Sequence, residues 1–153
     1  MDFSIVPFHE KWLDQMARLF TDGYQDSGYE WDEKTAKGYL QCYSWPKYAK
    51  YCFAAVDKKG TCLGAIFCRV DPWYKGNFLF IDQLQVEPEY RKKGIAKALM
   101  QEAFKTAKKD GCIGTHLLVD STNFTLKVYK SLGYKASGWI EMDMRWDGSP
   151  EVP

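Results

Sequence analysis

Residues 83–99 have the sequence QLQVEPEYRKKGIAKAL. A strand pattern ends at Val86, a short polar turn follows, and an amphipathic helix pattern opens at Gly94. The first backbone N–H groups of a helix lack a partner inside the helix, and together with the helix dipole they form a site for an anion such as a pyrophosphate. Gly94 and the small Ala96 let a phosphate approach the backbone closely, and the bases at 91–93 add positive charge. The stretch therefore predicts a phosphate-binding turn between a strand and a helix.

An ordinary solvated turn ahead of an amphipathic helix is the alternative, because the pattern Arg-x-x-Gly-x-Ala often occurs by chance. The strand before the turn and the helix after it favour the phosphate site. The glycine-rich phosphate loops G-x-x-x-x-G-K-S/T and G-x-G-x-x-G do not occur in the chain, and neither does the G-x-S-x-G elbow of hydrolases. A nucleotide-binding α/β domain and a serine hydrolase are therefore poorly supported.

The composition fits one globular domain over residues 1–147, followed by a tail over 148–153. The chain has 153 residues, 46% of them hydrophobic, which is enough for a core of its own. Its 21 Lys and Arg residues against 20 Asp and Glu residues give a net charge of +1, which argues against a nucleic-acid binder. No apolar run approaches the ~20 residues that span a bilayer, and the first residues do not form a secretion signal. We therefore expect a cytoplasmic protein with no membrane partner.

The cysteines predict neither a disulfide framework nor a metal site. They are Cys42, Cys52, Cys62, Cys68 and Cys112, an odd number in which no pair has the C-x-x-C spacing. Only His9 and His116 could join them as zinc ligands. We expect free thiols, most of them buried.

The hydrophobic periodicity predicts the order β-α-α-β-β-β-α-β-α-β. Strands are expected over 3–7, 51–56, 62–70, 77–86, 113–119 and 134–146, the last as one bent strand or two short ones. Helices are expected over 12–23, 32–41, 94–110 and 120–132. In the strand over 77–86, Phe78, Phe80, Leu84 and Val86 are expected on one face, with Asp82 falling among them unless a β-bulge intervenes. The pattern predicts a mixed sheet with helices on both faces.

Two motifs point to one family. The first is Val86-x-Pro88-x-Tyr90-Arg91-x-x-Gly94-Ile95-Ala96-x-x-Leu99, and the second is Tyr129-Lys130-Ser131-Leu132-Gly133-Tyr134. The first resembles the acetyl-coenzyme A signature of the GNAT N-acetyltransferases, and the second is similar to that family's later signature, Tyr-x-x-Leu-Gly-Phe/Tyr. The motifs occur in the family's order, and the resemblance covers about residues 3–146. It implies a single-domain α/β (α+β) fold with a mixed, mostly antiparallel sheet of about six to seven strands and about four helices.

The resemblance also implies a reaction and a co-substrate. Acetyl-CoA would donate its acetyl group to a primary amine by direct attack, with no metal and no covalent enzyme intermediate. The pantetheine arm would run along the strand end, and the pyrophosphate would bind the turn and the first turn of the helix. The residues implied as coenzyme contacts are Leu84, Gln85, Val86, Arg91, Lys92, Lys93, Gly94, Ile95, Ala96 and Lys97. The backbone N–H of Leu84 would polarise the thioester carbonyl.

The family pattern assigns the two proton transfers to two residues. Asp82 lies on the strand where the family often has a carboxylate base, although a carboxylate that merely bonds a neighbouring element is an equal alternative. Tyr129 matches the tyrosine that the family uses as general acid, with core packing as its alternative. The family often has an asparagine seven residues before that tyrosine, where this chain has Thr122, so the next residue, Asn123, is a candidate pantetheine contact.

The charge distribution suggests which acceptor would bind. Residues 21–33 carry five acids and no base, interleaved with Tyr24, Tyr29 and Trp31. Acidic and aromatic side chains attract a cation. Tyr29, Trp31 and Glu33 are therefore candidate substrate-binding residues, and Tyr43, Trp45, Tyr48 and Tyr51 form a second aromatic group that could line the same cleft. A solvated acidic loop next to ordinary core aromatic residues is the alternative. The expected acceptor is a small cationic amine, a polyamine or a peptide amine.

One alternative function stays open, which is a non-catalytic module that binds or senses acetyl-CoA on the same fold. The oligomeric state stays open as well, with a homodimer as one option.

Overall fold

The structure is a computed structural model that describes residues 2–25, 29–44, 46–120, 125–138, 140–142 and 144–146. The elements that precede the central strands are β1 (Ser4–Pro7), the 3-10 turn η1 (Glu10–Trp12), α1 (Leu13–Tyr24), α2 (Glu33–Gln41), η3 (Cys42–Ser44) and α3 (Pro46–Ala49). They are followed by β2 (Phe53–Val56), β3 (Cys62–Asp71), β4 (Phe78–Val86), η4 (Pro88–Tyr90), α4 (Ile95–Lys109), β5 (Gly114–Leu117) and α5 (Thr125–Ser131). Apart from the short helix α3, the predicted order of strands and helices is thus confirmed up to α5.

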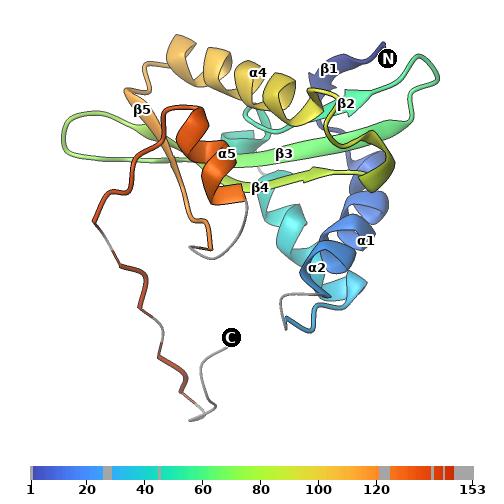
Figure 1. The fold of residues 1–153 in the computed structure, drawn as a ribbon, viewed down its shortest axis with the longest axis horizontal. Helices are drawn as coiled ribbons and strands as arrows, with labels where there is room; N and C mark the ends of the chain where they lie inside the picture. Colours follow the sequence, from blue (N-terminus) through green and yellow to red (C-terminus); the bar gives the residue numbers. More distant parts are fainter. Residues whose placement is uncertain are drawn as a thin grey trace.

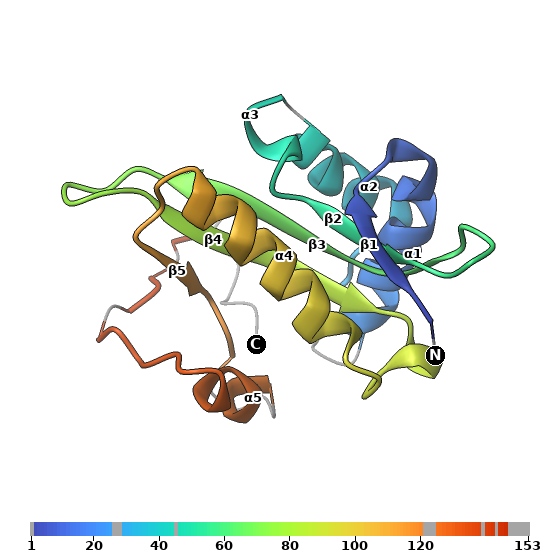
Figure 2. The ribbon, with the colours of Figure 1, turned by 90° about the horizontal axis from the view of Figure 1, so that it is seen from above.

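Within the described residues the sheet has five strands, in the order β1-β2-β3-β4-β5. Strands β1 to β4 pair with one another in antiparallel fashion, and β5 runs parallel to β4. Helices α1 and α2 cover one face and α4 covers the other, so the molecule has three layers (Figures 1 and 2). This mixed sheet with helices on both faces confirms the predicted fold class, although the strand count is lower than six to seven.

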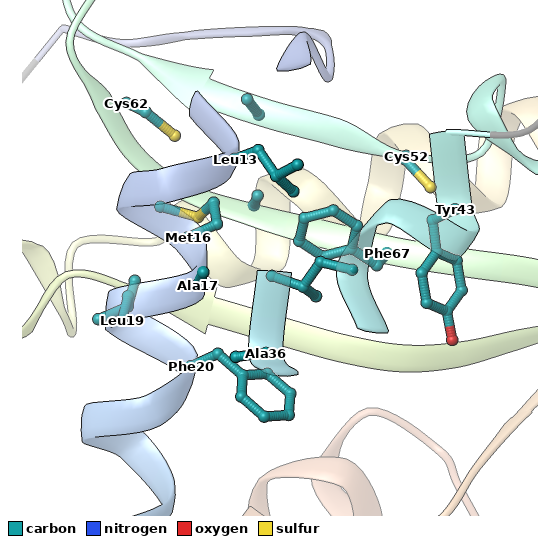
Figure 3. Close-up of a cluster of buried hydrophobic side chains, with 13 residues drawn as sticks. Leu13, Met16, Ala17, Leu19, Phe20, Ala36, Tyr43, Cys52, Cys62 and Phe67 are labelled. Carbon is teal, nitrogen blue, oxygen red and sulfur yellow. The ribbon is translucent and has the colours of Figure 1, made fainter. Parts of the chain in front are cut away.

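Apolar side chains fill the space on each side of the sheet. The first cluster joins α1 and α2 to β2 and β3 and includes Leu13, Met16, Phe20, Leu40 and Phe67 (Figure 3). The spacing of its α1 members at i, i+3 and i+7 places them on one side of that helix. The second cluster joins α4 to the opposite face of the sheet and includes the following residues: Leu63, Ile66, Leu79, Ile81, Ile95, Leu99, Met100 and Ala103.

The helices begin and end at residues that are suited to capping positions. The Asp32 side chain accepts a hydrogen bond from the Thr35 N–H at 2.9 Å and caps α2. Gly111, with φ +81°, follows the end of α4. Pro46 begins α3, a short helix that the sequence did not predict; proline is suited to a first helical position because its ring fixes φ.

The predicted strand over 134–146 is wrong for the described residues. Residues 140–142 and 144–146 belong to no strand and extend away from the sheet (Figure 1). Ile140, Met142, Met144 and Trp146 are 82%, 88%, 74% and 94% exposed. Alternating apolar residues form a strand only where a partner strand accepts their hydrogen bonds. The predicted tail over 148–153 lies outside the described residues.

Gly64 provides a test of how β3 packs against β4. A Cβ atom at this position would lie 2.5 Å from the Gln85 carbonyl oxygen and 3.0 Å from the Val86 Cα atom. We expect Gly64→Ala to lower the free energy of unfolding by about 2 kcal/mol, because backbone atoms of a central strand cannot move aside. Denaturation in urea measures this change.

Gly38 supplies the matched control. It lies in α2, and a Cβ atom added to it would meet nothing within 4 Å. Gly38→Ala should therefore stabilise the protein by about 0.5–1 kcal/mol through helix propensity. A Gly64→Ala protein as stable as the wild type would contradict the packing described for β3 and β4.

Candidate active site

The strands β4 and β5 separate part of the way along the sheet. Their parallel pairing runs from Phe78–Gly114 to Ile81–Leu117 and then stops. Strand β4 continues to Val86, paired on its other side with β3. Among the described residues no strand pairs with Asp82–Val86 on the β5 side. This stretch, which we call the open edge of β4, contains the predicted pantetheine contacts Leu84, Gln85 and Val86.

The predicted phosphate-binding turn lies directly after the open edge. Gly94 has φ +83° and precedes the first residue of α4, and Lys92 has φ +60°. The first hydrogen bond within α4 runs from the Ala98 N–H to the Gly94 carbonyl oxygen, at 3.0 Å. The N–H groups of Ile95, Ala96 and Lys97 precede that first bond and are free to bind an anion from outside the helix.

The side chains of the turn divide into two kinds. Arg91, Lys92, Lys93 and Lys97 are exposed and surround the helix start with positive charge. The Arg91 Nε atom also donates to the Val86 carbonyl oxygen at 3.0 Å, which ties the turn to the end of β4. The Ile95 side chain is buried in the second cluster, so this residue can offer a ligand only its backbone.

A β-bulge places Asp82 on the face of the sheet that α1 and α2 cover. The register passes from Phe67–Gln83 to Cys68–Ile81, which leaves Asp82 as the extra residue of β4. Leu84 and Val86 pack into the second cluster, whereas Asp82 and Gln83 contact Tyr39 and Tyr24 on the opposite face. The expected single face of Phe78, Phe80, Leu84 and Val86 is therefore wrong, because the bulge reverses the alternation after Ile81.

The Asp82 carboxylate is largely buried, and among the described residues Tyr39, Tyr43 and Arg69 interact with it. Its side chain is 12% exposed. One oxygen accepts a hydrogen bond from the Tyr39 hydroxyl of α2, and the other accepts from the Arg69 Nη1 atom of β3 at 3.2 Å. The carboxylate thus bonds neighbouring elements, which is the alternative that the sequence analysis left open for Asp82.

Burial and the Asp82 carboxylate act together on two phenols. They raise the pKa of Tyr39 from its ordinary value of 10.0 to about 12. Burial is also the main reason why the pKa of Tyr43 is raised, with Asp82 again contributing. Both hydroxyls therefore stay protonated at neutral pH and can donate hydrogen bonds beside Asp82.

The raised pKa values of Tyr39 and Tyr43 predict how the stability of the fold changes at high pH. A phenol whose pKa is higher in the folded state contributes stability that is complete below pH 10 and is lost as the pH rises toward 12. We expect the free energy of unfolding to fall across this window and to fall less in Tyr39→Phe. Urea denaturation at a series of pH values measures the slope. Tyr74→Phe, at a tyrosine that is 80% exposed, should keep the wild-type slope, and an unchanged slope in Tyr39→Phe would contradict the assignment.

An aromatic cluster lines the same side of the sheet. The Phe20 ring lies 4.8 Å from Trp31 and 5.6 Å from Tyr39, and the Tyr24 ring lies 5.7 Å from Tyr29. Two of the predicted substrate-binding residues, Tyr29 and Trp31, thus belong to a cluster that extends to the Asp82 partner Tyr39. Glu33 is exposed at the first turn of α2.

The second aromatic group of the prediction is divided between the two faces. Tyr43 lies beside Tyr39, with ring centroids 6.2 Å apart. The Tyr51 hydroxyl donates to Asp110 at 2.8 Å, and this residue belongs to the second cluster on the opposite face, so it does not line the cleft with Tyr43. Trp45 lies outside the described residues.

Tyr129 approaches the site from the face that α4 covers. Its ring packs into the second cluster, 5.7 Å from the Tyr134 ring. Burial and the nearby Tyr24 phenol raise the pKa of Tyr129, so its hydroxyl remains a proton donor at neutral pH. Among the described residues no side chain hydrogen-bonds to this hydroxyl. The candidate pantetheine contact Asn123 and its neighbour Thr122 lie outside the described residues.

The sequence prediction missed three polar residues around Asp82, namely Tyr39, Arg69 and Gln83. Gln83 Nε2 donates to the Tyr24 hydroxyl at 3.3 Å, and Arg69 bonds Asp82 directly. The signal for Arg69 was available, because it is a charged residue that interrupts the apolar run of β3. Tyr39 gave no such signal, because a tyrosine on an amphipathic helix is ordinary.

In the part of the chain that is described, no three His, Cys, Asp or Glu side chains are grouped to hold a metal ion, and no helix has the length and apolar character to cross a membrane.

Comparison with known proteins supplies independent evidence on the family to which the chain belongs. The sequence profile of the Acetyltransferase (GNAT) family matches residues 10–134. The chain is 34% identical over 95 residues to N-alpha-acetyltransferase 30 of Xenopus laevis, a match that covers 60% of this chain and 33% of the relative. The chain thus spans less than half the length of such curated relatives.

Solved structures share the fold. A transcriptional regulator from Bacillus halodurans C-125 superposes with a TM-score of 0.77 at 24% identity, covering 95% of this chain and all of that one. The NatC complex bound to Gag peptide and CoA has a chain that superposes with a TM-score of 0.67 at 24% identity, covering 94% of this chain and 87% of that chain. Because the family profile covers most of the sequence and the fold agrees, the chain belongs to the acetyltransferase (GNAT) family.

Proposed function

We propose that the protein transfers an acetyl group from acetyl-CoA to a primary amine by direct attack. The observation that carries the proposal is the open edge of β4 next to the left-handed turn at the start of α4. An extended pantetheine arm fits an open strand edge, because its amides can pair with the backbone as a further strand would. The pyrophosphate fits the free N–H groups of the turn at the end of that edge. CoA is bound in the NatC complex, whose fold this chain shares.

The chemistry needs a C–N bond made, a C–S bond broken, two protons removed from the cationic amine and one proton given to the thiolate. The amine nitrogen attacks the thioester carbonyl carbon, and a backbone N–H of the open edge, that of Leu84 in our assignment, stabilises the oxyanion. Because a protonated nitrogen has no lone pair, Asp82 first receives one proton from the cationic amine, directly or through water, and the second proton passes to solvent after the C–N bond has formed. The C–S bond then breaks, and Tyr129 gives its proton to the departing thiolate. The products are an N-acetylated amine and free CoA.

The class of acceptor is inferred from the Asp82 carboxylate and the aromatic side chains on the same face of the sheet. The Asp82 carboxylate and the Tyr24, Tyr29, Trp31 and Tyr39 rings lie on the face of the sheet opposite α4. A cationic amine is attracted by a carboxylate and by aromatic rings, whereas an anion is repelled. We therefore assign a small cationic amine, a polyamine or the amine of a peptide as the acceptor. The α-amino group to which the name N-alpha-acetyltransferase 30 refers is an amine of this class.

Thiol release from acetyl-CoA tests the function. Purified protein is mixed with acetyl-CoA and a panel of polyamines, lysine analogues, peptides with free amino termini, and anionic amino sugars. We expect free CoA to form with at least one cationic amine and the acetylated amine to appear by mass spectrometry. Binding of acetyl-CoA without thiol release in any arm would instead identify a sensing module, and reaction of the anionic acceptors alone would contradict the assigned acceptor class.

A further inference from the structure

Arg69 lies in a small cluster of charged and aromatic side chains on the Asp82 face of the sheet. Its members are Arg69 and Asp71 of β3, Phe80 and Asp82 of β4, and His116 of β5. Arg69 is opposite Phe80 in the register, and Phe80 is opposite His116. Because alternate residues of a strand share a face, the five side chains lie side by side across three neighbouring strands.

The Arg69 guanidinium contacts three side chains, those of Phe80, Asp71 and Asp82. The guanidinium carbon lies 3.9 Å from the centroid of the Phe80 ring. The Nε atom donates to Asp71 Oδ1 at 2.9 Å and the Nη2 atom approaches Asp71 Oδ2 at 3.5 Å. The ring thus sets the plane of the guanidinium, and the two-point contact with Asp71 sets its rotation within that plane.

The remaining nitrogen is then directed at the candidate base. Arg69 Nη1 donates to Asp82 Oδ1 at 3.2 Å, while the Tyr39 hydroxyl donates to the other oxygen. Asp82 is the bulged residue of β4, so the regular ladder with β3 does not by itself fix its direction. Arg69 on β3 and Tyr39 on α2 donate to the Asp82 carboxylate and so fix its direction where the ladder does not.

Asp71 is in turn held from the far side. The His116 Nε2 atom lies 3.1 Å from Asp71 Oδ2, and the His116 ring meets the Phe80 ring edge-on, with centroids 5.0 Å apart. Asp71 therefore has partners on β3 and β5, and Arg69 has a fixed anchor. The chain of contacts runs from His116 through Asp71 and Arg69 to Asp82.

We propose that Arg69 is a positioning residue for acetyl transfer, which holds the Asp82 carboxylate toward the acceptor amine, and that Asp71 orients Arg69 for this purpose. This inference rests on the proposed function, since it assigns Arg69 a part in the same reaction. Arg69 does not take up or release the proton itself, because a guanidinium stays protonated in proteins. Its substitution should therefore affect the proton-accepting step and leave coenzyme binding unchanged.

Substitutions of Arg69 and Asp82, alone and together, test the proposal. We expect Arg69→Met to lower kcat by about 10-fold to 100-fold, because misplacement of a reacting group by a fraction of an ångström is costly. The affinity for acetyl-CoA, measured by calorimetry, should change less than about twofold. Arg69→Lys should recover part of the loss, because it restores the charge without the planar contact with Phe80 and Asp71. Asp71→Asn should lower kcat less than Arg69→Met, and it serves as the second variant if Arg69→Met does not fold.

The double variant separates a positioning role from a structural one. If Arg69 acts through Asp82, then Arg69→Met has no further effect on kcat in an Asp82→Asn protein. The control is Arg18→Met, which breaks the 3.1 Å ion pair with Glu87 away from this cluster and should leave kcat unchanged. Equal losses from Arg69→Met in both backgrounds would overturn the positioning role while leaving the acetyltransferase function intact. A wild-type protein that binds acetyl-CoA and releases no thiol with any amine would overturn both.

Discussion

Replacing Tyr129 by phenylalanine lowers the turnover number at least about tenfold and changes the affinity for acetyl-CoA by less than about twofold. The reason is that the thiolate of CoA leaves poorly without a proton donor, and the Tyr129 hydroxyl is the donor that we assign. Its raised pKa keeps it protonated at neutral pH, and its ring remains in the second cluster after substitution. Steady-state thiol release gives the turnover number, and calorimetry gives the affinity.

Tyr134→Phe is the matched control for this experiment. Its ring contacts Tyr129, but its hydroxyl pairs with the Thr115 hydroxyl at 3.1 Å, so it is already engaged within the fold. This variant should keep a turnover number within about threefold of the wild type, because it loses one hydrogen bond and no proton donor. An unaltered turnover number in Tyr129→Phe would remove Tyr129 from the chemistry.

The second large effect concerns the turn that precedes α4. We expect Gly94→Ala to weaken acetyl-CoA binding by about tenfold or more, equivalent to about 1.4 kcal/mol. With φ +83°, Gly94 occupies the left-handed region, where a Cβ atom costs about 1–2 kcal/mol. An alanine would shift the turn and present a methyl group where the phosphate approaches the backbone. Calorimetric titration with acetyl-CoA measures the loss.

A Gly111→Ala variant, at the other end of α4, distinguishes a loss of phosphate binding at Gly94 from the effect of backbone strain alone. It has φ +81°, and a Cβ atom added to it would meet nothing within 4 Å, as is also true of Gly94. Gly111→Ala should therefore lose about as much folding stability as Gly94→Ala while binding acetyl-CoA with the wild-type affinity. Equal affinities for the two variants would show that the phosphate does not bind at the turn.

Local patterns predicted the fold well where each element carries its own signal. The run of apolar residues at helix spacing in 95–107 predicted α4, and the glycines at each of its ends predicted its limits. The hairpin strands β2 and β3 followed from continuous apolar runs on either side of the Asp57–Gly60 turn. The strand over 134–146 failed because its pattern specifies only an amphipathic strand, and whether it forms depends on a partner elsewhere in the chain.

The site was predictable only in the segments that the two motifs cover. The turn at 91–97 and Tyr129 could be named from those motifs. The partners of Asp82 could not, because Tyr39 and Arg69 reach it from elements 43 and 13 residues away, and sequence periodicity says nothing about such contacts. The sequence left a β-bulge near Asp82 undecided, and the bulge that the structure shows determines which face of the sheet carries the carboxylate.

Calorimetric titration of the purified protein with CoA tests the central claim most directly. If the open edge of β4 and the turn at the start of α4 form a coenzyme site, then CoA binds with one site per chain, and Gly94→Ala weakens that binding while Gly111→Ala does not. A folded protein that shows no binding of CoA or acetyl-CoA at millimolar concentrations would contradict the coenzyme site and, with it, the proposed acetyl transfer.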